Sequence, residues 1–263
     1  SNDGLHFFAT ALAPQPQTHM LTLRLFSVLA GFGAAIGLWR VYRSIPAGVE
    51  SRQWICAVFA LLGVLTGARV GYVLAHPFYY SLHPEQAGQF WLGGFNAFGA
   101  FAGAVFFALL GSAALRLNVL SALDSTSRML LPTAALIWLG LWYEGVAYGQ
   151  TLPSGAFLSY PALDETGMLS NRFPLQLVAA LSLLLLLGLI EHITQFKRPG
   201  FRFSLVSLVF FTHTLVFSLF RADVVFPIRG IRSDGVLSLI FAVAFALLSV
   251  LLLLTSDQKK RIK

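Results

Sequence analysis

The chain has few charged residues and a single cysteine, and each shortage excludes a class of protein. Only 11% of its 263 residues are charged, whereas a soluble globular domain carries about 25%. With 57% hydrophobic residues and a mean hydropathy of +0.74, the composition indicates an integral membrane protein. The lone Cys56 excludes an intrachain disulfide framework and a metal site built from several cysteines. We expect neither a metal nor a cofactor.

Long hydrophobic runs make up most of the sequence. Cut at its charged and Pro/Gly-rich breaks, the chain gives seven apolar segments long enough to cross about 30 Å of hydrocarbon. These segments cover residues 21–42, 54–76, 90–112, 129–149, 174–195, 203–220 and 235–255. The sequence therefore predicts an all-α integral membrane protein with seven transmembrane helices.

The basic residues are distributed unequally between the two sides of these spans. Of the 18 Lys and Arg residues, twelve fall on one side and five on the other, and Arg69 lies inside a span. Because loops rich in Lys and Arg stay in the cytoplasm, we predict an outside N-terminus and a cytoplasmic C-terminus. Topology thus explains the net charge of +7, and no nucleic-acid partner is expected.

The two ends of the chain differ from the apolar middle. Residues 1–20 contain a short apolar run, Leu5 to Leu12, which is too short to span a membrane and is followed by two prolines. We expect a short interfacial helix there, lying among the outer headgroups. The expected organisation is an interfacial segment over 1–20, a membrane domain over 21–255 and a basic cytoplasmic tail over 256–263.

Two ionisable side chains interrupt the predicted spans. Arg69 lies near the outward end of the second span, where an unpaired charge costs about 2.5 kcal/mol or more. Its guanidinium suits a lipid phosphate, although a side chain that reaches back to the interface is a competing explanation. Glu144 lies in the fourth segment. A structural ion pair with Arg69 explains this carboxylate at least as well as acid–base catalysis does.

Other candidates are a histidine and several glycines. His213 lies in the middle of the sixth span, where a packing role is favoured over that of a base or a haem ligand. Gly99 and Gly103 are spaced for close approach of two helices. Gly93 and Gly94 are harder to explain by packing, because they loosen the start of the third span. They suggest irregular backbone facing a cavity.

Taken in order, four segments resemble the prolipoprotein diacylglyceryl transferase family. The segments are Gly67–Leu74, Trp91–Gly103, Asp124–Gly149 and Arg172–Leu177. Enzymes of this family move a diacylglyceryl group from phosphatidylglycerol to the thiol of a lipobox cysteine. The resemblance implies a seven-span protein of the bacterial inner membrane with its N-terminus outside, in agreement with the topology predicted from the basic residues.

The departures from the family pattern fall on the chemistry. Phe98 stands where the family has the histidine taken to activate the thiol. The signature arginine, two asparagines and glutamate of the family fall at Trp138, Leu141, Glu144 and Val146. Phenylalanine and leucine can neither accept a proton nor bind a phosphate, so these replacements would cost orders of magnitude in rate.

These departures favour a non-catalytic member that binds lipid or serves as a subunit of a membrane assembly. Its expected partners are a phosphatidylglycerol-like phospholipid and other membrane proteins. One alternative is an active transferase with a rearranged site that uses Glu144 or His213. Another is a small-molecule transporter or cofactor-binding subunit with His213 as ligand. If a lipid binds, Arg69 should face its headgroup, and Phe98 and Trp138 should line the same pocket. The full set of expected lipid-binding residues is Arg69, Tyr72, Gly93, Gly94, Phe98, Trp138, Arg172 and Gln176.

Overall fold

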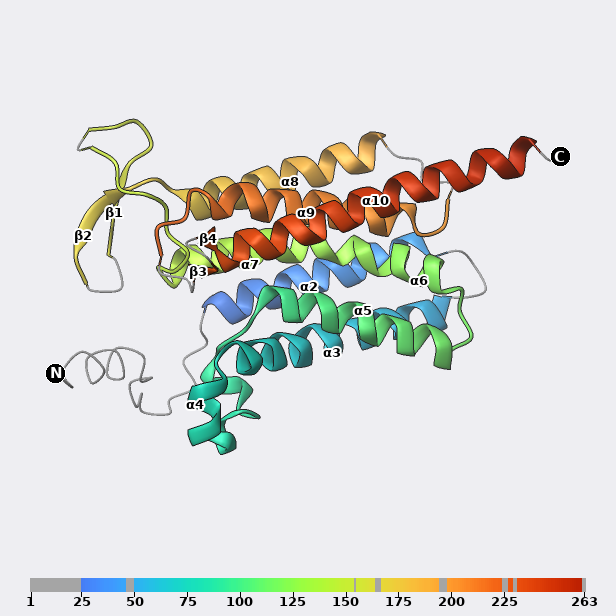
Figure 1. Ribbon diagram of the computed structural model, residues 1–263, viewed down its shortest axis with the longest axis horizontal. Coiled ribbons are helices and arrows are strands. Elements are labelled where there is room, and N and C mark those ends of the chain that lie inside the picture. Colours follow the sequence, from blue (N-terminus) through green and yellow to red (C-terminus); the bar gives the residue numbers. More distant parts are fainter. Residues whose placement is uncertain are drawn as a thin grey trace.

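The computed structural model is a bundle of long helices with short irregular segments at its ends (Figure 1). It describes residues 25–45, 50–153, 155–163, 167–193, 198–223, 227–228 and 231–261. The longer helices are α2 (Leu25–Ser44), α3 (Glu50–Ala75), α5 (Ala97–Ala114), α7 (Leu130–Tyr143), α8 (Leu175–Ile193), α9 (Phe201–Ser218) and α10 (Ser233–Arg261). The shorter elements are α4 (Pro77–Leu82), η1 (Pro84–Gln86), η2 (Phe90–Leu92), α6 (Val119–Thr126), η3 (Ser127–Met129), β1 (Tyr160–Leu163), β2 (Leu169–Arg172), β3 (Pro227–Ile228) and β4 (Ile231–Arg232).

The helical membrane fold predicted from the sequence is confirmed. Among the described residues, six helices are long and apolar enough to cross a membrane, and they are α2, α3, α5, α8, α9 and α10. The fourth predicted segment contains α7, which has 14 residues and is therefore about 21 Å long. The seventh span and the orientation in the membrane stay predictions. The expected interfacial helix over 1–20 lies outside the described residues.

Two of the predicted segments are wrong at one end. The fourth was expected to reach residue 149, but α7 ends at Tyr143, because Gly145 (φ +68°) and Ala147 (φ +57°) adopt left-handed backbone. The third was expected to begin at residue 90, but α5 begins at Ala97. Gly93 and Gly94 both have positive φ, which breaks the helix before Asn96.

Glycines bring α3 and α5 into close contact along their length. A Cβ atom added to Gly67 would lie 2.7 Å from the Cα of Gly103, and one added to Gly99 would lie 2.8 Å from the Cα of Gly71. Both distances are shorter than side chains tolerate, so the two backbones touch directly. The close helix approach predicted from Gly99 and Gly103 is confirmed. We call this contact the glycine seam.

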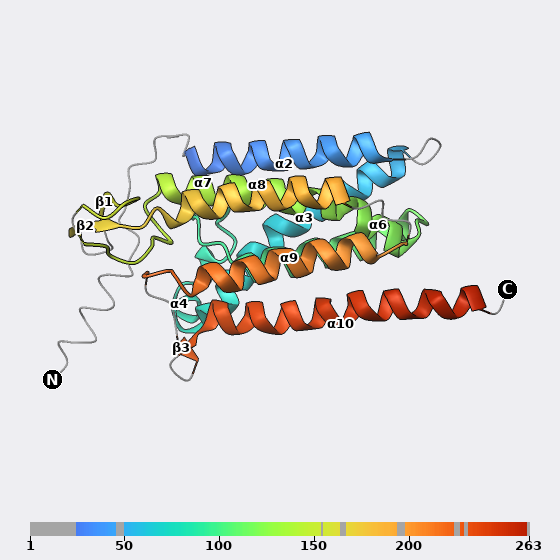
Figure 2. The ribbon, with the colours of Figure 1, turned by 90° about the horizontal axis from the view of Figure 1, so that it is seen from above.

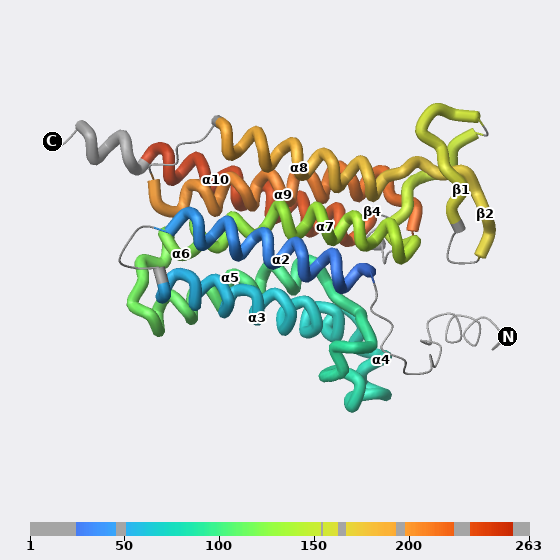
Figure 3. Tube along the Cα trace, turned by 180° about the vertical axis from the view of Figure 1, so that it is seen from behind, coloured from blue at the N-terminus to red at the C-terminus, as the bar shows by residue number. Residues whose placement is uncertain are grey.

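The remaining helices pack against one another beside this pair. Helix α2 packs on α7, α7 on α8, and α9 on α10; Figure 2 shows this arrangement from above, and Figure 3 shows α2 beside α7 from behind. Serines line the contact between α9 and α10, where the hydroxyl oxygens of Ser204 and Ser249 lie 2.6 Å apart. The short helix α6 and the η3 turn contact helices of both groups, α3 and α5 on one side and α2, α7 and α9 on the other.

Two irregular regions lie at the end of the bundle opposite α6 (Figure 1). One holds α4, η1 and η2. The other is the antiparallel β1–β2 hairpin, in which Tyr160 pairs with Arg172 and Leu163 with Leu169. At this end, the connection from α9 to α10 carries two ion pairs to Asp234. Arg221 Nη1 lies 3.1 Å from its Oδ2, and Arg232 Nε lies 3.2 Å from its Oδ1.

The glycine seam generates a first prediction. Gly103→Ala places a methyl group against the α3 backbone, and we expect a loss of about 1–3 kcal/mol, the usual result of overpacking. Gly31→Ala on α2 is the matched control, because a Cβ atom there meets nothing within 4 Å. Thermal unfolding of the purified protein in detergent measures both variants. Equal melting temperatures for the two variants would contradict the role given to the seam.

Candidate functional site

Arg69 is buried at the α4 end of α3, and its guanidinium is bound by backbone carbonyls. Nε donates to the carbonyl of Ala87 (2.9 Å) and Nη2 to that of Gln86 (2.5 Å). Nη1 donates to the carbonyls of Gly93 and Gly94. The side chain is only 3% exposed. Arg69 therefore fixes the segment from Gln86 to Gly94 onto α3.

Aromatic rings complete this arrangement. The guanidinium carbon of Arg69 lies 5.5 Å from the ring centre of Tyr80. A Cβ atom at Gly94 would lie 2.6 Å from the Tyr72 ring, so only glycine fits there without a shift. The predicted site residues Arg69, Tyr72, Gly93 and Gly94 thus lie together. We call the segment 84–94 and its contacts with Arg69 the arginine clamp.

The expected ion pair between Arg69 and Glu144 is wrong. Glu144 follows the last residue of α7 and is exposed, because α7 ends six residues before the predicted span does. Four of the five N–H groups of Arg69 already point at carbonyl oxygens of the clamp. A lipid phosphate at Arg69 would have to compete with these carbonyls, so the headgroup role of Arg69 stays a prediction.

An apolar cavity lies between the glycine seam and the rest of the bundle. Its volume is about 140 Å³, and it is lined by α3, α5, α6, η3, α7 and α9. Its polar lining residues are hydroxyl side chains only: Thr126, Ser127 and Thr133. No acid, base or amide side chain belongs to the lining, so the cavity holds no group that could activate a thiol.

Phe98 and Trp138 do not share this cavity, contrary to expectation. Phe98 stacks on Phe211 and Phe241, with ring centres 6.1 and 6.0 Å apart. Trp138 is buried in a separate apolar cluster, where it packs beside Phe217. Neither side chain lines the cavity, because helix packing directs both toward neighbouring helices while Ala97 and Ile137 face the void.

His213 is buried between α8 and α9. Its Nε2 lies 2.8 Å from the Ser182 hydroxyl, and its ring stacks on Phe217 with centres 4.3 Å apart. This setting agrees with a packing histidine and lies outside the cavity lining. Within the described part of the chain, no three His, Cys, Asp or Glu residues are grouped so that they could hold a metal.

Arg172 and Gln176 lie together where the hairpin meets α8. The Arg172 guanidinium is 4.3 Å from the ring centre of Tyr148, and Gln176 Nε2 donates to the carbonyl of Val146 (2.9 Å). Both side chains are buried and hold the segment that leaves α7. Burial raises the pKa of the nearby Tyr160 phenol, opposed by a hydrogen bond with Trp142, the charge of Arg172 and a hydrogen bond with Gln176.

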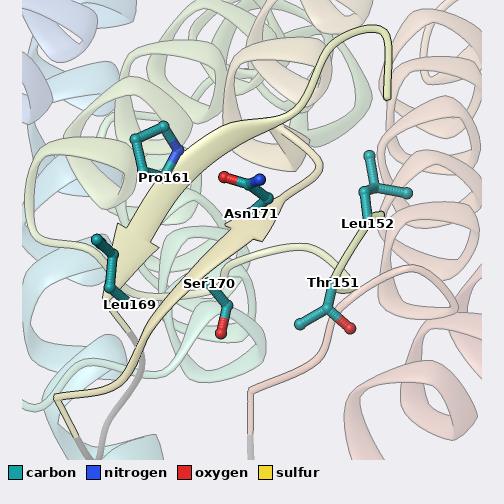
Figure 4. Close-up of a pocket in the computed structure, with 6 residues that line it drawn as sticks. All are labelled: Thr151, Leu152, Pro161, Leu169, Ser170 and Asn171. Carbon is teal, nitrogen blue, oxygen red and sulfur yellow. The ribbon is translucent and has the colours of Figure 1, made fainter. Parts of the chain in front are cut away.

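Sequence reasoning missed Tyr148 and Tyr160 as members of this group. Tyr148 lies in the segment Asp124–Gly149 but is not singled out in it, and Tyr160 lies outside all four segments. The pairing of Tyr160 with Arg172 across the hairpin and the contact of Arg172 with Tyr148 bring them close. A shallow pocket of about 390 Å³ lies on the same hairpin (Figure 4). Its lining residues are Thr151, Leu152, Pro161, Leu169, Ser170 and Asn171. None of them is titratable, so this pocket offers no catalytic group either.

The fold and the site define an α-helical integral membrane protein with a buried arginine clamp and an apolar cavity inside the bundle. A family model described as prolipoprotein diacylglyceryl transferase matches residues 17–251, and the chain belongs to this family. The family expected from the sequence is thereby confirmed.

Three relatives, each named phosphatidylglycerol–prolipoprotein diacylglyceryl transferase, show how far the similarity extends. The protein of Bacillus licheniformis is 30% identical over 135 residues, which is 51% of this chain and 50% of the relative. The protein of Acaryochloris marina is 25% identical over 88% of this chain and 84% of its own length. The protein of Thermosynechococcus vestitus is 22% identical over 82% and 80%.

The arginine clamp generates a second prediction. Arg69→Lys keeps the charge but loses the planar fork that reaches several carbonyls at once. We expect a loss of about 3 kcal/mol, since each hydrogen bond to a charged group contributes about 1.5–3 kcal/mol. Hydrogen exchange of the amides in residues 84–94 should accelerate. Arg43→Lys, at an exposed position at the other end of the bundle, is the control, and equal exchange in the two variants would exclude the clamp.

Proposed function

We propose that this chain is a lipid-binding member of the family that holds an acyl chain in its apolar cavity and does not transfer it. The proposal places it in a bacterial inner membrane, with its N-terminus outside and a phosphatidylglycerol-like lipid as its ligand. The observation that carries it is the cavity lining, which offers three hydroxyls and otherwise only apolar side chains.

The energetics of the cavity support an acyl chain as its occupant. An empty void of about 140 Å³ forfeits packing equivalent to about 3 kcal/mol, at the cost per volume measured for buried cavities. A chain that enters from the bilayer leaves one apolar medium for another, so it loses no hydration on the way. It regains the dispersion contacts that the empty cavity lacks.

Phe98 supports the absence of transfer. At the position where the family has its thiol-activating histidine, the ring of Phe98 packs beside the stacked rings of Phe211 and Phe241. The phenyl ring of Phe98 cannot accept a proton. The buried His213 is bonded to Ser182 and stands outside the cavity lining, so it does not replace the missing base there.

An active transferase is the second candidate, and the names of the relatives favour it. Family membership favours both candidates over a transporter. For the second candidate, the reacting groups would have to come from side chains outside the cavity, such as Glu144 at the exposed end of α7.

Transfer of labelled diacylglyceryl from phosphatidylglycerol to a lipobox peptide separates the two candidates. We expect no turnover by the purified protein, and none by Phe98→His, because one histidine does not restore the donors that stabilise developing charge. The relative from Bacillus licheniformis, assayed in parallel, is the positive control. Turnover by the unmodified chain would establish the second candidate and overturn the first.

Lipid retention tests the cavity itself. Ala104→Phe fills the void from α5, and we expect the variant to co-purify with less phospholipid than the unmodified protein. Ala113→Phe adds the same ring at an exposed position of the same helix and is the matched control. Mass spectrometry of extracted lipids gives the molar ratio of lipid to protein. If Ala104→Phe retains as much lipid as Ala113→Phe, the acyl chain lies elsewhere.

A further inference from the structure

Three arginines from different elements gather around one carboxylate at the α6 end of the bundle. Arg40 Nη2 on α2 lies 2.6 Å from Glu191 Oε1 on α8. Arg202, at the start of α9, also pairs with Oε1 of Glu191. Arg128 Nη1, in the η3 turn, lies 3.9 Å from Oε2. Three positive charges thus face a single glutamate.

The neighbouring Asp124 does little to balance this charge. Its Oδ2 accepts the amide of Gly200 (2.6 Å) and its Oδ1 accepts the amide of Phe203 (2.8 Å), so its oxygens bind backbone at the start of α9. Burial raises the pKa of the Asp124 carboxyl, and these two N–H bonds and the charges of Arg202 and Arg128 only partly offset that effect. Even with Asp124 ionised, three arginines meet two carboxylates among the side chains that the structure describes in this cluster.

Arg128 is the arginine best placed to bind a further anion. Its distance to Glu191 exceeds that of a hydrogen bond, and its side chain is 27% exposed. Arg202, by contrast, is almost fully buried against Glu191. Glu191 therefore holds Arg40 and Arg202 in place, while Arg128 is the most exposed of the three arginines.

The cluster adjoins the apolar cavity. Ser127 and Met129, on either side of Arg128 in the chain, both line the cavity, and so does Phe203, which follows Arg202. A ligand with an anionic group at the arginines and an apolar chain beside them matches both surfaces. This arrangement favours a lipid over a soluble anion.

We propose that Arg128, beside the charges of Arg40 and Arg202, binds the phosphate of an anionic phospholipid headgroup in the leaflet at the α6 end of the bundle. Guanidinium groups bind phosphate oxygens through paired, charge-assisted hydrogen bonds. The predicted topology puts this end in the cytoplasmic leaflet, where basic residues near the membrane surface attract anionic lipid. The site does not depend on the proposed function, because Arg128 can bind a phosphate whether or not a chain fills the cavity.

Native mass spectrometry of the purified protein titrated with phosphatidylglycerol tests the site. Arg128→Gln removes the most exposed arginine and leaves the buried pair of Arg202 with Glu191 intact. We expect at least about tenfold weaker binding, from the loss of one hydrogen bond to a charged group, about 1.5 kcal/mol. Arg52→Gln is the control, since it removes one charge from an exposed position at the same end. Equal affinities in the two variants would overturn the proposal.

Two further probes identify the source of the phosphate and separate this site from the cavity. Glycerophosphoglycerol has the headgroup without acyl chains, so its loss of binding in Arg128→Gln would support the site even if Ala104→Phe shows that the cavity holds no chain. Displacement of phosphatidylglycerol by millimolar inorganic phosphate, reduced in Arg128→Gln, would support the arginine site and assign it to soluble phosphate. Failure of both soluble probes, with lipid binding still weakened by Arg128→Gln, would support a headgroup held together with its chain.

Discussion

A guanidinium inside an apolar bundle is stable only if its hydrogen-bond donors find acceptors, and the arginine clamp meets this need with backbone carbonyls. The consequences extend along the chain. The clamp fixes Gly93 and Gly94, whose positive φ values turn the backbone toward Asn96. The amide of Asn96 then donates to the carbonyl of Ala68 (2.9 Å), and its side chain caps α5. The position of α5 on α3, and hence the glycine seam, depends on this one side chain.

The helices form the scaffold, but the lining of the cavity beside the glycine seam contains no acid or base. The helices, the arginine clamp and the Arg172 contacts form a scaffold within the chain. The reacting centre requires groups that change charge, and the lining of the cavity contains none. Aromatic rings instead fill the space around Phe98, where Phe101, Phe211 and Phe241 pack against one another. Arg40, Arg128 and Arg202 lie together at the α6 end of the bundle, around Glu191.

Much of the fold could be predicted from the sequence, because span length and hydrophobicity are local properties. The end of α7 could not, since a left-handed residue such as Ala147 leaves no compositional signal, whereas Gly93 and Gly94 do indicate irregular backbone before α5. The sequence correctly identifies Arg69 as a buried charge, but it does not identify the partners of this charge. The partners are backbone carbonyls, whereas the sequence offers only acidic side chains as candidates. Phe98 and Trp138 were placed in one pocket because the family pattern aligns them. Which side of each helix faces the cavity depends on the rotation of that helix about its axis, and this rotation is determined by packing against the other helices.

The glycine seam also bears on how the protein is made. Its two helices, α3 and α5, follow each other among the long apolar helices, so their contact closes a short stretch of chain. A contact between neighbours in sequence forms with little loss of chain entropy. This pair can therefore assemble as a hairpin in the bilayer while α8, α9 and α10 are still on the ribosome. The later helices then dock on a surface that is already formed.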